Sequence, residues 1–259
     1  MSDRQLSTPS DPTPQPDPLR RAQSLRAANK RRGRWSFLWD WGATVLVAIV
    51  VVIIIHTFIV QPYTIPSGSM EHTLLVGDFL LVNKAVYGAE IPFLHKRLPA
   101  FEKPKRGDVI VFDFPRGPSK VFVKRLIGLP GDTVAMRDGV LLVNGVRVDE
   151  PYVIHEGPRD RASEEFLWQR PYLVKNAEAS IGLHPSGNNW GPLVVPDRNY
   201  FTLGDNRDDS WDSRYWGFVP DSLLRGRPMI VYYSCDHSGH DRHPCLTNVR
   251  WSRIGTRIH

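Results

Sequence analysis

The chain has 259 residues and a formal net charge of +6, and this positive charge is unevenly distributed. Seven Lys or Arg residues fall between positions 20 and 34 with no acidic residue among them, and the rest of the chain is close to neutral. This concentration argues against nucleic-acid binding, which places basic residues across a domain. Beyond a short tail and an apolar run, roughly 200 residues remain, enough for one sizeable domain or two small ones.

The apolar run covers residues 43–60 and contains no Asp, Glu, Lys or Arg. With Trp41 and Gly42 it reaches the roughly 20 residues that cross a bilayer core. A buried helix of a soluble domain and a cleaved signal peptide are the alternatives. The run begins late, is long for a signal peptide and lacks a small-x-small cleavage site after it, which favours a retained transmembrane helix over residues 41–60.

The basic cluster precedes this span, which is the pattern of a cytoplasmic flank. We therefore expect residues 1–40 to form a disordered cytoplasmic tail and residues 61–259 to lie outside the cytoplasm. The protein is then a single-pass membrane protein. Its two cysteines, Cys235 and Cys245, lie in a compartment that permits a disulfide.

From residue 65 onward the sequence is mainly β, with short Val, Ile, Phe and Tyr runs between Gly, Pro, Asn and Asp. Arg137-Asp138-Gly139 and Asn144-Gly145 predict hairpin turns. Residues 151–196 interrupt this pattern and are interpreted as an inserted subdomain between two parts of one β-domain, residues 61–150 and 197–259. The predicted strands are 79–82, 109–114, 121–127, 133–136, 140–143, 200–203 and 229–233.

A basic segment, residues 92–106, carries four large apolar side chains among its lysines and arginines. It could lie on a bilayer surface, with basic groups toward headgroups. A solvated loop with a few packed side chains explains the same composition equally well.

Ser69 is the candidate nucleophile. It lies in the small-residue loop 66–70, which begins six residues after the apolar run ends at Val60. A serine hydroxyl needs an adjacent base. None of the nine histidines stands in a setting that marks it as that base, since four crowd the C-terminal tail and His56 is in the apolar run. A neutral lysine is the other known solution.

Lys124 is suited to this role. It lies in the predicted strand 121–127, where alternation places Phe122, Lys124 and Leu126 on one face and Arg125 on the other. Apolar neighbours desolvate an ammonium group and lower its pKa. The alternative is an ordinary edge lysine that reaches out to water.

Residues 204–214 are dense in charge and follow a predicted strand. The composition would suit a calcium loop, but the spacing of such a loop is absent. Carboxylates that alternate with Arg207 and Arg214 favour an internally paired scaffold, for example a bidentate Asp212–Arg214 contact.

Four stretches together resemble bacterial type I signal peptidase, also called leader peptidase. They are Ile65 to Met70 with Thr73, Leu74, Gly77 and Asp78; residues 106–112; residues 123–132; and residues 204–219. They occur in the order and spacing of that family, directly after an apolar run. The resemblance implies a mainly β fold: a signal-peptidase-like antiparallel catalytic sheet with a small inserted subdomain and one N-terminal transmembrane helix.

The resemblance also implies roles for individual residues. Ser69 would attack the substrate carbonyl, and Lys124 would act as general base and then as acid. Ser67 would donate a hydrogen bond to the oxyanion, and Ser210 would hold Lys124. Asp212 and Arg214 would form a supporting pair. Small residues before the cleaved bond would occupy shallow apolar pockets, lined by Ile65, Pro66, Met70, Leu74, Phe122 and Val123. The alternative is that these are plain core residues, and for Leu74 and Val123 both interpretations can hold.

The resulting hypothesis is a membrane-bound serine endopeptidase that removes signal peptides from exported preproteins after small residues. Its partners would be signal peptides and membrane lipid, with no nucleic acid, cofactor or metal, and we expect a monomer. A self-cleaving Ser–Lys enzyme and a non-catalytic, membrane-tethered β-domain are the competing hypotheses.

The C-terminal segment between Cys235 and Cys245 contains three histidines. A disulfide that closes a short hairpin is the preferred interpretation. An unbridged surface loop comes second and a metal site third, because the spacing matches no standard zinc pattern.

Overall fold

The structure is a computed structural model that describes residues 19, 39, 41–91, 94, 96–117, 120–156, 164–174, 185–236 and 244–259. The chain divides into two units, Met1–Ile53 and Ile54–His259. Apart from two positions, the predicted tail 1–40 lies outside the described residues.

An apolar helix spans Trp41–Ile59, within one residue of the predicted membrane span. Its mean hydropathy is 2.7 and none of it is buried within the protein. Nineteen residues of helix extend about 28 Å, close to the thickness of a bilayer core. The last five residues form a π-helical turn, η1 (Ile55–Ile59), which leads directly into the first strand. The helix is therefore long and apolar enough to cross a membrane.

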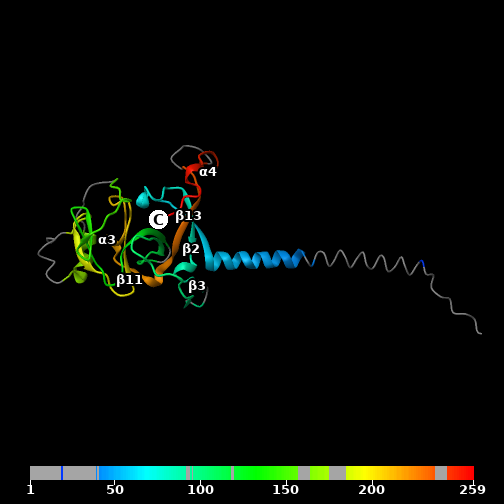
Figure 1. The fold of residues 1–259 in the computed structure, drawn as a ribbon, viewed down its shortest axis with the longest axis horizontal. Coiled ribbons are helices and arrows are strands. Elements are labelled where there is room, and N and C mark those ends of the chain that lie inside the picture. Colours follow the sequence, from blue (N-terminus) through cyan, green and yellow to red (C-terminus); the bar gives the residue numbers. More distant parts are fainter. Residues whose placement is uncertain are drawn as a thin grey trace, which may run out of the picture. The chain divides into compact units, whose positions relative to one another are not determined.

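The larger sheet has seven strands, and every neighbouring pair in it is antiparallel. Its long strand β13 lies beside β2, as Figure 1 shows. This confirms the predicted antiparallel, mainly β fold. In spatial order the strands are β1 (Val60–Thr64), β2 (Asp78–Asn83), β13 (Leu224–Ser234), β5 (Val109–Asp113), β6 (Val121–Gly128), β11 (Asn199–Leu203) and β12 (Val219–Pro220).

A second sheet has four strands, in the order β10 (Trp190–Val194), β7 (Thr133–Arg137), β8 (Val140–Val143) and β9 (Val146–Arg147). A third has two, β3 (Glu90–Ile91) and β4 (Lys96–Arg97). The four-stranded sheet joins strands from both sides of residue 150, where the sequence suggested that a subdomain begins. The division into 61–150, 151–196 and 197–259 stays a proposal.

Both predicted hairpin turns are present in the second sheet. The first has positive φ at Asp138 (47°) and Gly139 (78°), and the second at Asn144 (52°) and Gly145 (77°). Positive φ at both central residues is the type I′ geometry that matches the twist of the flanking strands. The local sequence therefore fixed the register of β7 with β8 and of β8 with β9.

Helices in the described part of the domain are short, so the sheets position the side chains. The longest is a 3₁₀ segment of nine residues. The helices are η2 (Gly68–Met70), η3 (Ala85–Tyr87), η4 (Glu164–Tyr172), α3 (Ser213–Trp216), η5 (Asp221–Leu223), α4 (Pro244–Thr247) and η6 (Trp251–Arg253).

The basic segment 92–106 follows β3 and is only partly described. Leu98 and Phe101 donate backbone N–H bonds to Ala89 and Val86, at 2.9 and 3.1 Å. The Phe101 side chain is nonetheless 83% exposed. The segment is thus pinned through its backbone while it presents an apolar ring outward, and both interpretations of its role stay predictions.

Buried apolar side chains form three clusters. One surrounds the start of the large sheet and includes Ile65, Met70, Leu74 and Val111. Another lies on β5 and β6 and is built around aromatic and aliphatic side chains that include Phe112, Leu126 and Trp216. The third lies between the two larger sheets. Strand β6 contributes to the packing of all three clusters, which makes it the central element of the domain.

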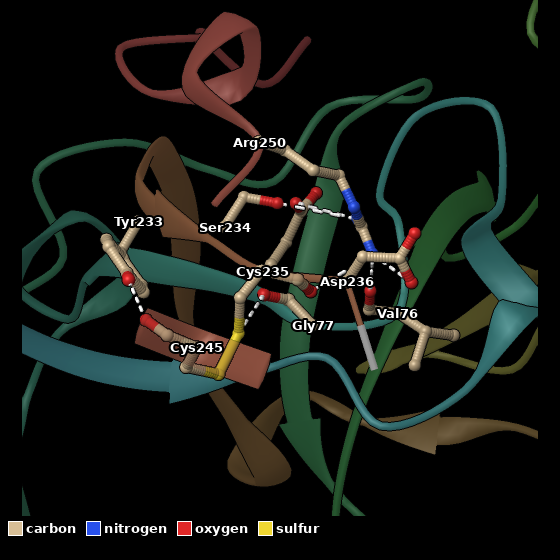
Figure 2. Close-up of a disulfide and its surroundings, with 9 residues drawn as sticks. Val76, Gly77, Tyr233, Ser234, Cys235, Asp236, Cys245 and Arg250 are labelled. Carbon is tan, nitrogen blue, oxygen red and sulfur yellow. Dashed lines mark hydrogen bonds and ion pairs between the residues drawn. A yellow bond between two sulfur atoms is a disulfide. The ribbon is translucent and has the colours of Figure 1, made fainter. Parts of the chain in front are cut away.

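A disulfide joins Cys235, just beyond the end of β13, to Cys245 in α4. Figure 2 shows this bridge beside the Gly77 carbonyl, which accepts a hydrogen bond from the Cys235 backbone N–H at 3.1 Å. Arg250 donates to the carbonyls of Val76 (2.7 Å) and Cys235 (3.0 Å). The bridge confirms the preferred interpretation of the two cysteines. It ties the C-terminal segment to the end of β13, and the hydrogen bonds of Cys235 and Arg250 join both to the turn that precedes β2.

Candidate active site

Ser69 lies in the 3₁₀ turn η2, in the connection between β1 and β2. The backbone of Ile65 fixes the start of this connection, because its N–H donates to Asp78 and its carbonyl accepts from Gly77, both at 2.9 Å. Met70 is buried in the core, and its carbonyl accepts from the Leu74 N–H at 2.7 Å. Ser69 is therefore held between two anchored points, with 9% of its surface exposed.

Lys124 reaches Ser69 from strand β6, 55 positions later in the chain. Its Nζ and the Ser69 Oγ are hydrogen-bonded to each other. Lys124 is paired with Ile110 of β5, and only 2% of it is exposed. The side chain does not reach out to water, so the interpretation as an ordinary edge lysine is wrong.

Burial lowers the pKa of Lys124 to about 8, from an ordinary value of 10.5. Four charged groups modify this effect. Asp212, Asp205 and Asp209 raise the pKa of the lysine, and Arg214 lowers it. Removal of water is the largest cause, as the apolar neighbours of Lys124 in the sequence had suggested.

An open cavity of about 310 Å³ adjoins the two residues. Seven of its lining residues were predicted from the sequence in addition to Lys124: Ile65, Pro66, Ser67, Ser69, Met70, Phe122 and Val123. The sequence did not predict Tyr63, Thr64, Lys120 and Val121, which also line it.

Leu74 differs from the other predicted lining residues. It is fully buried in the core cluster of Ile65 and Met70 and does not line the cavity. The structure therefore shows Leu74 as a packing residue of the core cluster that also contains Met70. Val123 has both roles, because it lines the cavity and packs against the same cluster.

Ser210 is buried close to the site. An added Cβ on Gly204 would lie 2.1 Å from the Ser210 Oγ and 2.5 Å from the Ser69 carbonyl oxygen, so three chain segments meet here. The Ser210 Oγ has no hydrogen-bond partner in the part of the chain that the structure describes. The predicted bond from Ser210 to Lys124 is therefore not formed, although Ser210 stands beside the site.

Asp212 and Arg214 form the predicted bidentate pair. Arg214 Nε donates to one carboxylate oxygen at 2.9 Å and Arg214 Nη2 to the other at 2.8 Å, and both side chains are buried. Asp212 also accepts from the Gly204 backbone N–H at 3.1 Å. The guanidinium lowers the pKa of Asp212 against the opposing effect of burial. The pair is thus charged, and it fixes the backbone that carries Ser210.

A second buried pair was not predicted. Arg125 Nε and Nη2 donate to the two oxygens of Asp205, at 2.8 and 2.7 Å. The same carboxylate accepts from the Thr73 hydroxyl at 2.5 Å. Alternation in β6 had predicted that Arg125 points away from Lys124, but no local signal names a partner 80 positions later. The pair ties β6 to the segment that follows β11, and the Thr73 hydroxyl joins the connection after Ser69 to the same carboxylate.

These contacts decide between the two interpretations of residues 204–214. Two of the carboxylates that a calcium ion would need, Asp205 and Asp212, are bound by guanidinium groups. Among the residues that the structure describes, no group of three or more His, Cys, Asp and Glu could hold a metal ion. The segment is an internally paired scaffold.

A serine hydroxyl held against a dehydrated lysine amine, beside an open apolar cavity, is the arrangement of serine hydrolases that use lysine in place of histidine. Comparison with known proteins agrees with this class. The family described as "Signal peptidase, peptidase S26" matches residues 38–233. The chain belongs to this signal peptidase family, which makes it an enzyme and confirms the resemblance noted in its sequence.

Individual relatives of the chain are named signal peptidase I. "Signal peptidase I" of Pseudomonas aeruginosa is 36% identical, with 84% of this chain and 78% of the relative covered. "Signal peptidase I" of Aquifex aeolicus is 37% identical, with 72% of this chain and 80% of the relative covered. A crystal structure of a signal peptidase I from Enterococcus faecalis is 36% identical over 49% of this chain and 98% of that chain, with a TM-score of 0.34.

Proposed function

We propose that this chain is a membrane-bound serine endopeptidase that cleaves N-terminal signal peptides from exported preproteins, with Ser69 as nucleophile and Lys124 as general base. The observation that carries the proposal is the hydrogen bond between the Ser69 Oγ and the Lys124 Nζ. Because Lys124 is 2% exposed, its amine can be neutral near physiological pH and accept the serine proton.

The reaction has two halves. Ser69 Oγ attacks the carbonyl carbon of the substrate while its proton passes to Lys124 Nζ. The resulting ammonium then gives that proton to the leaving amine as the peptide bond breaks, which leaves an acyl-enzyme. Water then attacks the acyl carbon and gives a proton to the Lys124 amine. That ammonium returns the proton to the Ser69 oxygen as the acyl bond breaks, and both residues regain their starting state.

Ser67 and the backbone N–H of Ser69 are the proposed donors to the oxyanion. Ser67 is exposed at the cavity that Ser69 also lines, so its hydroxyl can turn toward a bound carbonyl oxygen. Loss of one such donor typically lowers kcat by about 10²–10³. We expect Ser67→Ala to reduce kcat more than KM.

The apolar lining of the cavity and the strand edge beside it support the binding of an extended substrate with small apolar residues before the cleaved bond. The cavity walls are mainly apolar, with Ile65, Met70, Phe122 and Val123 among them. On one side of β6, the neighbouring strand is β11, which pairs with β6 only from Arg125 onward. Residues 121–124 of β6 therefore have no β11 partner among the described strands. An extended substrate can add to such an edge through its backbone and place alternate side chains in the pockets.

Membrane attachment is part of the proposed function. Ten positions separate Ile59, the last residue of the apolar helix, from Ser69. Ten extended residues span at most about 35 Å, so Ser69 acts within that distance of the end of the helix. A signal peptide is itself apolar and presents its cleavage site there. The basic cluster before the helix supports a cytoplasmic N-terminus and an extracytoplasmic catalytic domain.

The test is cleavage of a purified preprotein by the full-length enzyme and by Ser69→Ala, Lys124→Ala and Lys124→Met. We expect each variant to lose roughly 10³-fold or more in turnover. Lys124→Met keeps the buried volume and removes only the base. The exposed residues Ser222 and Lys103 provide matched controls, and Ser222→Ala and Lys103→Ala should cleave normally. Wild-type turnover in any Ser69 or Lys124 variant would refute the assignment.

A further inference from the structure

Four aromatic side chains pack together beside Lys124, and we call them the aromatic cluster: Phe114, Phe122, Trp211 and Trp216. In all six pairs among them, the ring centroids lie 5.0 to 5.9 Å apart. Two of the rings belong to the end of the β5–β6 hairpin and two to the segment that carries Asp212 and Arg214. The aromatic cluster therefore joins the strand of the base to the scaffold of buried ion pairs.

Trp211 is the exposed member of this cluster. Its neighbours in the chain are fixed, since Ser210 is 6% and Asp212 0% exposed, yet Trp211 itself is 43% exposed. Its ring contacts those of Phe114, Phe122 and Trp216, at centroid distances of 5.0, 5.9 and 5.2 Å. The ring thus covers the other three from the solvent side.

Phe122 connects the aromatic cluster to the base. The Lys124 Nζ lies 5.8 Å from the centroid of the Phe122 ring, and both residues line the cavity. The part of β6 that carries Phe122 pairs with β5 but, before Arg125, not with β11. The Phe122 ring is held by Phe112, its cross-strand partner on β5 at a centroid distance of 6.4 Å, and by the other three rings of the aromatic cluster.

We propose that Trp211 is a positioning residue for Lys124: it holds Phe122 against the lysine side chain and keeps water from the amine. The inference rests on the proposed role of Lys124 as the base. Trp211 is not among the residues that line the cavity, and in this proposal it acts through Phe122.

The charges around Lys124 make this cover important. The groups that face the amine are Asp212, Asp205 and Asp209, which raise its pKa, and Arg214, which lowers it. Three carboxylates oppose one guanidinium, so these charges together do not explain a lowered value. Exclusion of water is the larger cause. A change that admits water beside Phe122 should therefore move the lysine back toward its ordinary pKa.

The experiment measures kcat/KM for a preprotein from about pH 6.5 to pH 10, with the full-length enzyme in detergent. We call the rise of kcat/KM with pH, on the acid side of the profile, the acid limb. We expect Trp211→Ala to move the midpoint of the acid limb upward by about one pH unit. That shift means a roughly tenfold loss of kcat/KM near pH 7 that disappears at high pH. Trp211→Phe keeps an aromatic ring and should restore most of the wild-type limb. Trp251→Ala is the matched control, since Trp251 is 76% exposed and lies in η6, and its limb should not move.

A purely structural role for Trp211 would give a different result: an equal loss at every pH, or no loss at all, and either outcome overturns the inference. If Trp211→Ala proves too unstable to purify, Trp211→Leu decides, because it keeps apolar volume without the ring and must shift the limb in the same direction. Ser69→Ala and Lys124→Ala are run in the same assay. Activity in these two would refute the proposed function itself, whereas an unshifted limb in the Trp211 variants refutes only the positioning role.

Discussion

The proposed role of Lys124 as a base depends on the burial of this single residue. A lysine with its ordinary pKa would be neutral in only about one molecule in several thousand at pH 7. Burial lowers the pKa of Lys124 to about 8, at which roughly one molecule in ten is neutral. The gain is a few hundredfold in the population of the form that can accept the proton from Ser69.

The first prediction concerns the pH dependence of the reaction. The base works when neutral, so kcat/KM should rise with pH and level off above about 8. The measurement is a profile of kcat/KM against pH for the wild-type enzyme. A limb near pH 10.5, the value of an exposed lysine, would contradict the assignment of a dehydrated base.

The second prediction concerns Asp212. Asp212→Asn leaves the buried Arg214 guanidinium without its counter-charge, and breaking a buried pair in this way costs about 3–5 kcal/mol of unfolding free energy. The substitution also removes a charge that raises the pKa of Lys124, so the acid limb should move to lower pH. Urea titration measures the first effect and the pH profile the second.

Asp221→Asn is the matched control for this prediction. Asp221 also pairs with an arginine, at 2.9 Å, but that partner, Arg198, is 80% exposed. Exposed ion pairs contribute little to stability, so this variant should unfold like the wild type. Equal stability of the Asp212 and Asp221 variants would show that burial of the first pair has no energetic consequence.

At the scale of elements, local patterns predicted the strands whose side chains alternate and the hairpins whose turns have a defined chemistry. Strand β8 has its predicted bounds, and β6 ends within one residue of them. Strand β1 was missed, because Val60–Thr64 continues an apolar run and contains a proline. Its pairing with β2 is a long-range contact that no local pattern contains, and Pro62 is tolerated because β1 lies at the sheet edge.

In the candidate active site, too, the residues with a local sequence signal could be predicted, and the long-range contacts could not. Ser69 and Lys124 could be named because each carries a local signal, a small-residue loop and an apolar strand face. The Arg125–Asp205 pair could not, since it joins two elements whose adjacency only the folded sheet defines. The Ser210 hydroxyl was assigned to Lys124 by resemblance alone, and the structure leaves it without a partner among the described residues.

The third prediction concerns the contact between elements at Gly204. A Cβ there would lie 2.1 Å from Ser210 Oγ and 2.5 Å from the carbonyl oxygen of Ser69, closer than real Cβ contacts allow. The Ser69 carbonyl is backbone and cannot turn away. Gly204→Ala should therefore displace the catalytic turn, with a loss in kcat of at least about 10²-fold, because a misplacement of 1 Å can have that effect.

Gly117→Ala is its control, because a Cβ at Gly117 would meet only Phe114, at an ordinary 4.0 Å. That variant should keep wild-type kcat. Normal kcat in Gly204→Ala would mean that Ser69 and Ser210 approach each other less closely than the structure indicates.

At the scale of the whole molecule, the disulfide connects the fold to the proposed compartment. It fastens the C-terminal segment to the end of β13, and Arg250 and the Cys235 N–H reach the carbonyls of Val76 and Gly77 in the turn before β2 (Figure 2). The connection that carries Ser69 runs from Ile65 to this same turn, because Gly77 directly precedes β2. The disulfide, a bond that oxidising compartments favour, therefore lies beside the turn at which the connection that carries Ser69 ends.

The fourth prediction tests this link. Replacing both cysteines by serine should lower the unfolding free energy by about 2–3 kcal/mol, since the bridge closes a loop of about ten residues. Reductant should lower the melting temperature of the wild-type protein to that of the double variant and should leave the variant unchanged.

In intact cells, a membrane-impermeant thiol reagent should label the wild-type protein only after reduction, because an extracytoplasmic domain forms the bridge and remains accessible from outside. Labelling without reductant would show an open bridge. Absence of labelling after reduction, with labelling restored once the membrane is permeabilised, would place the domain on the cytoplasmic side and reverse the proposed orientation.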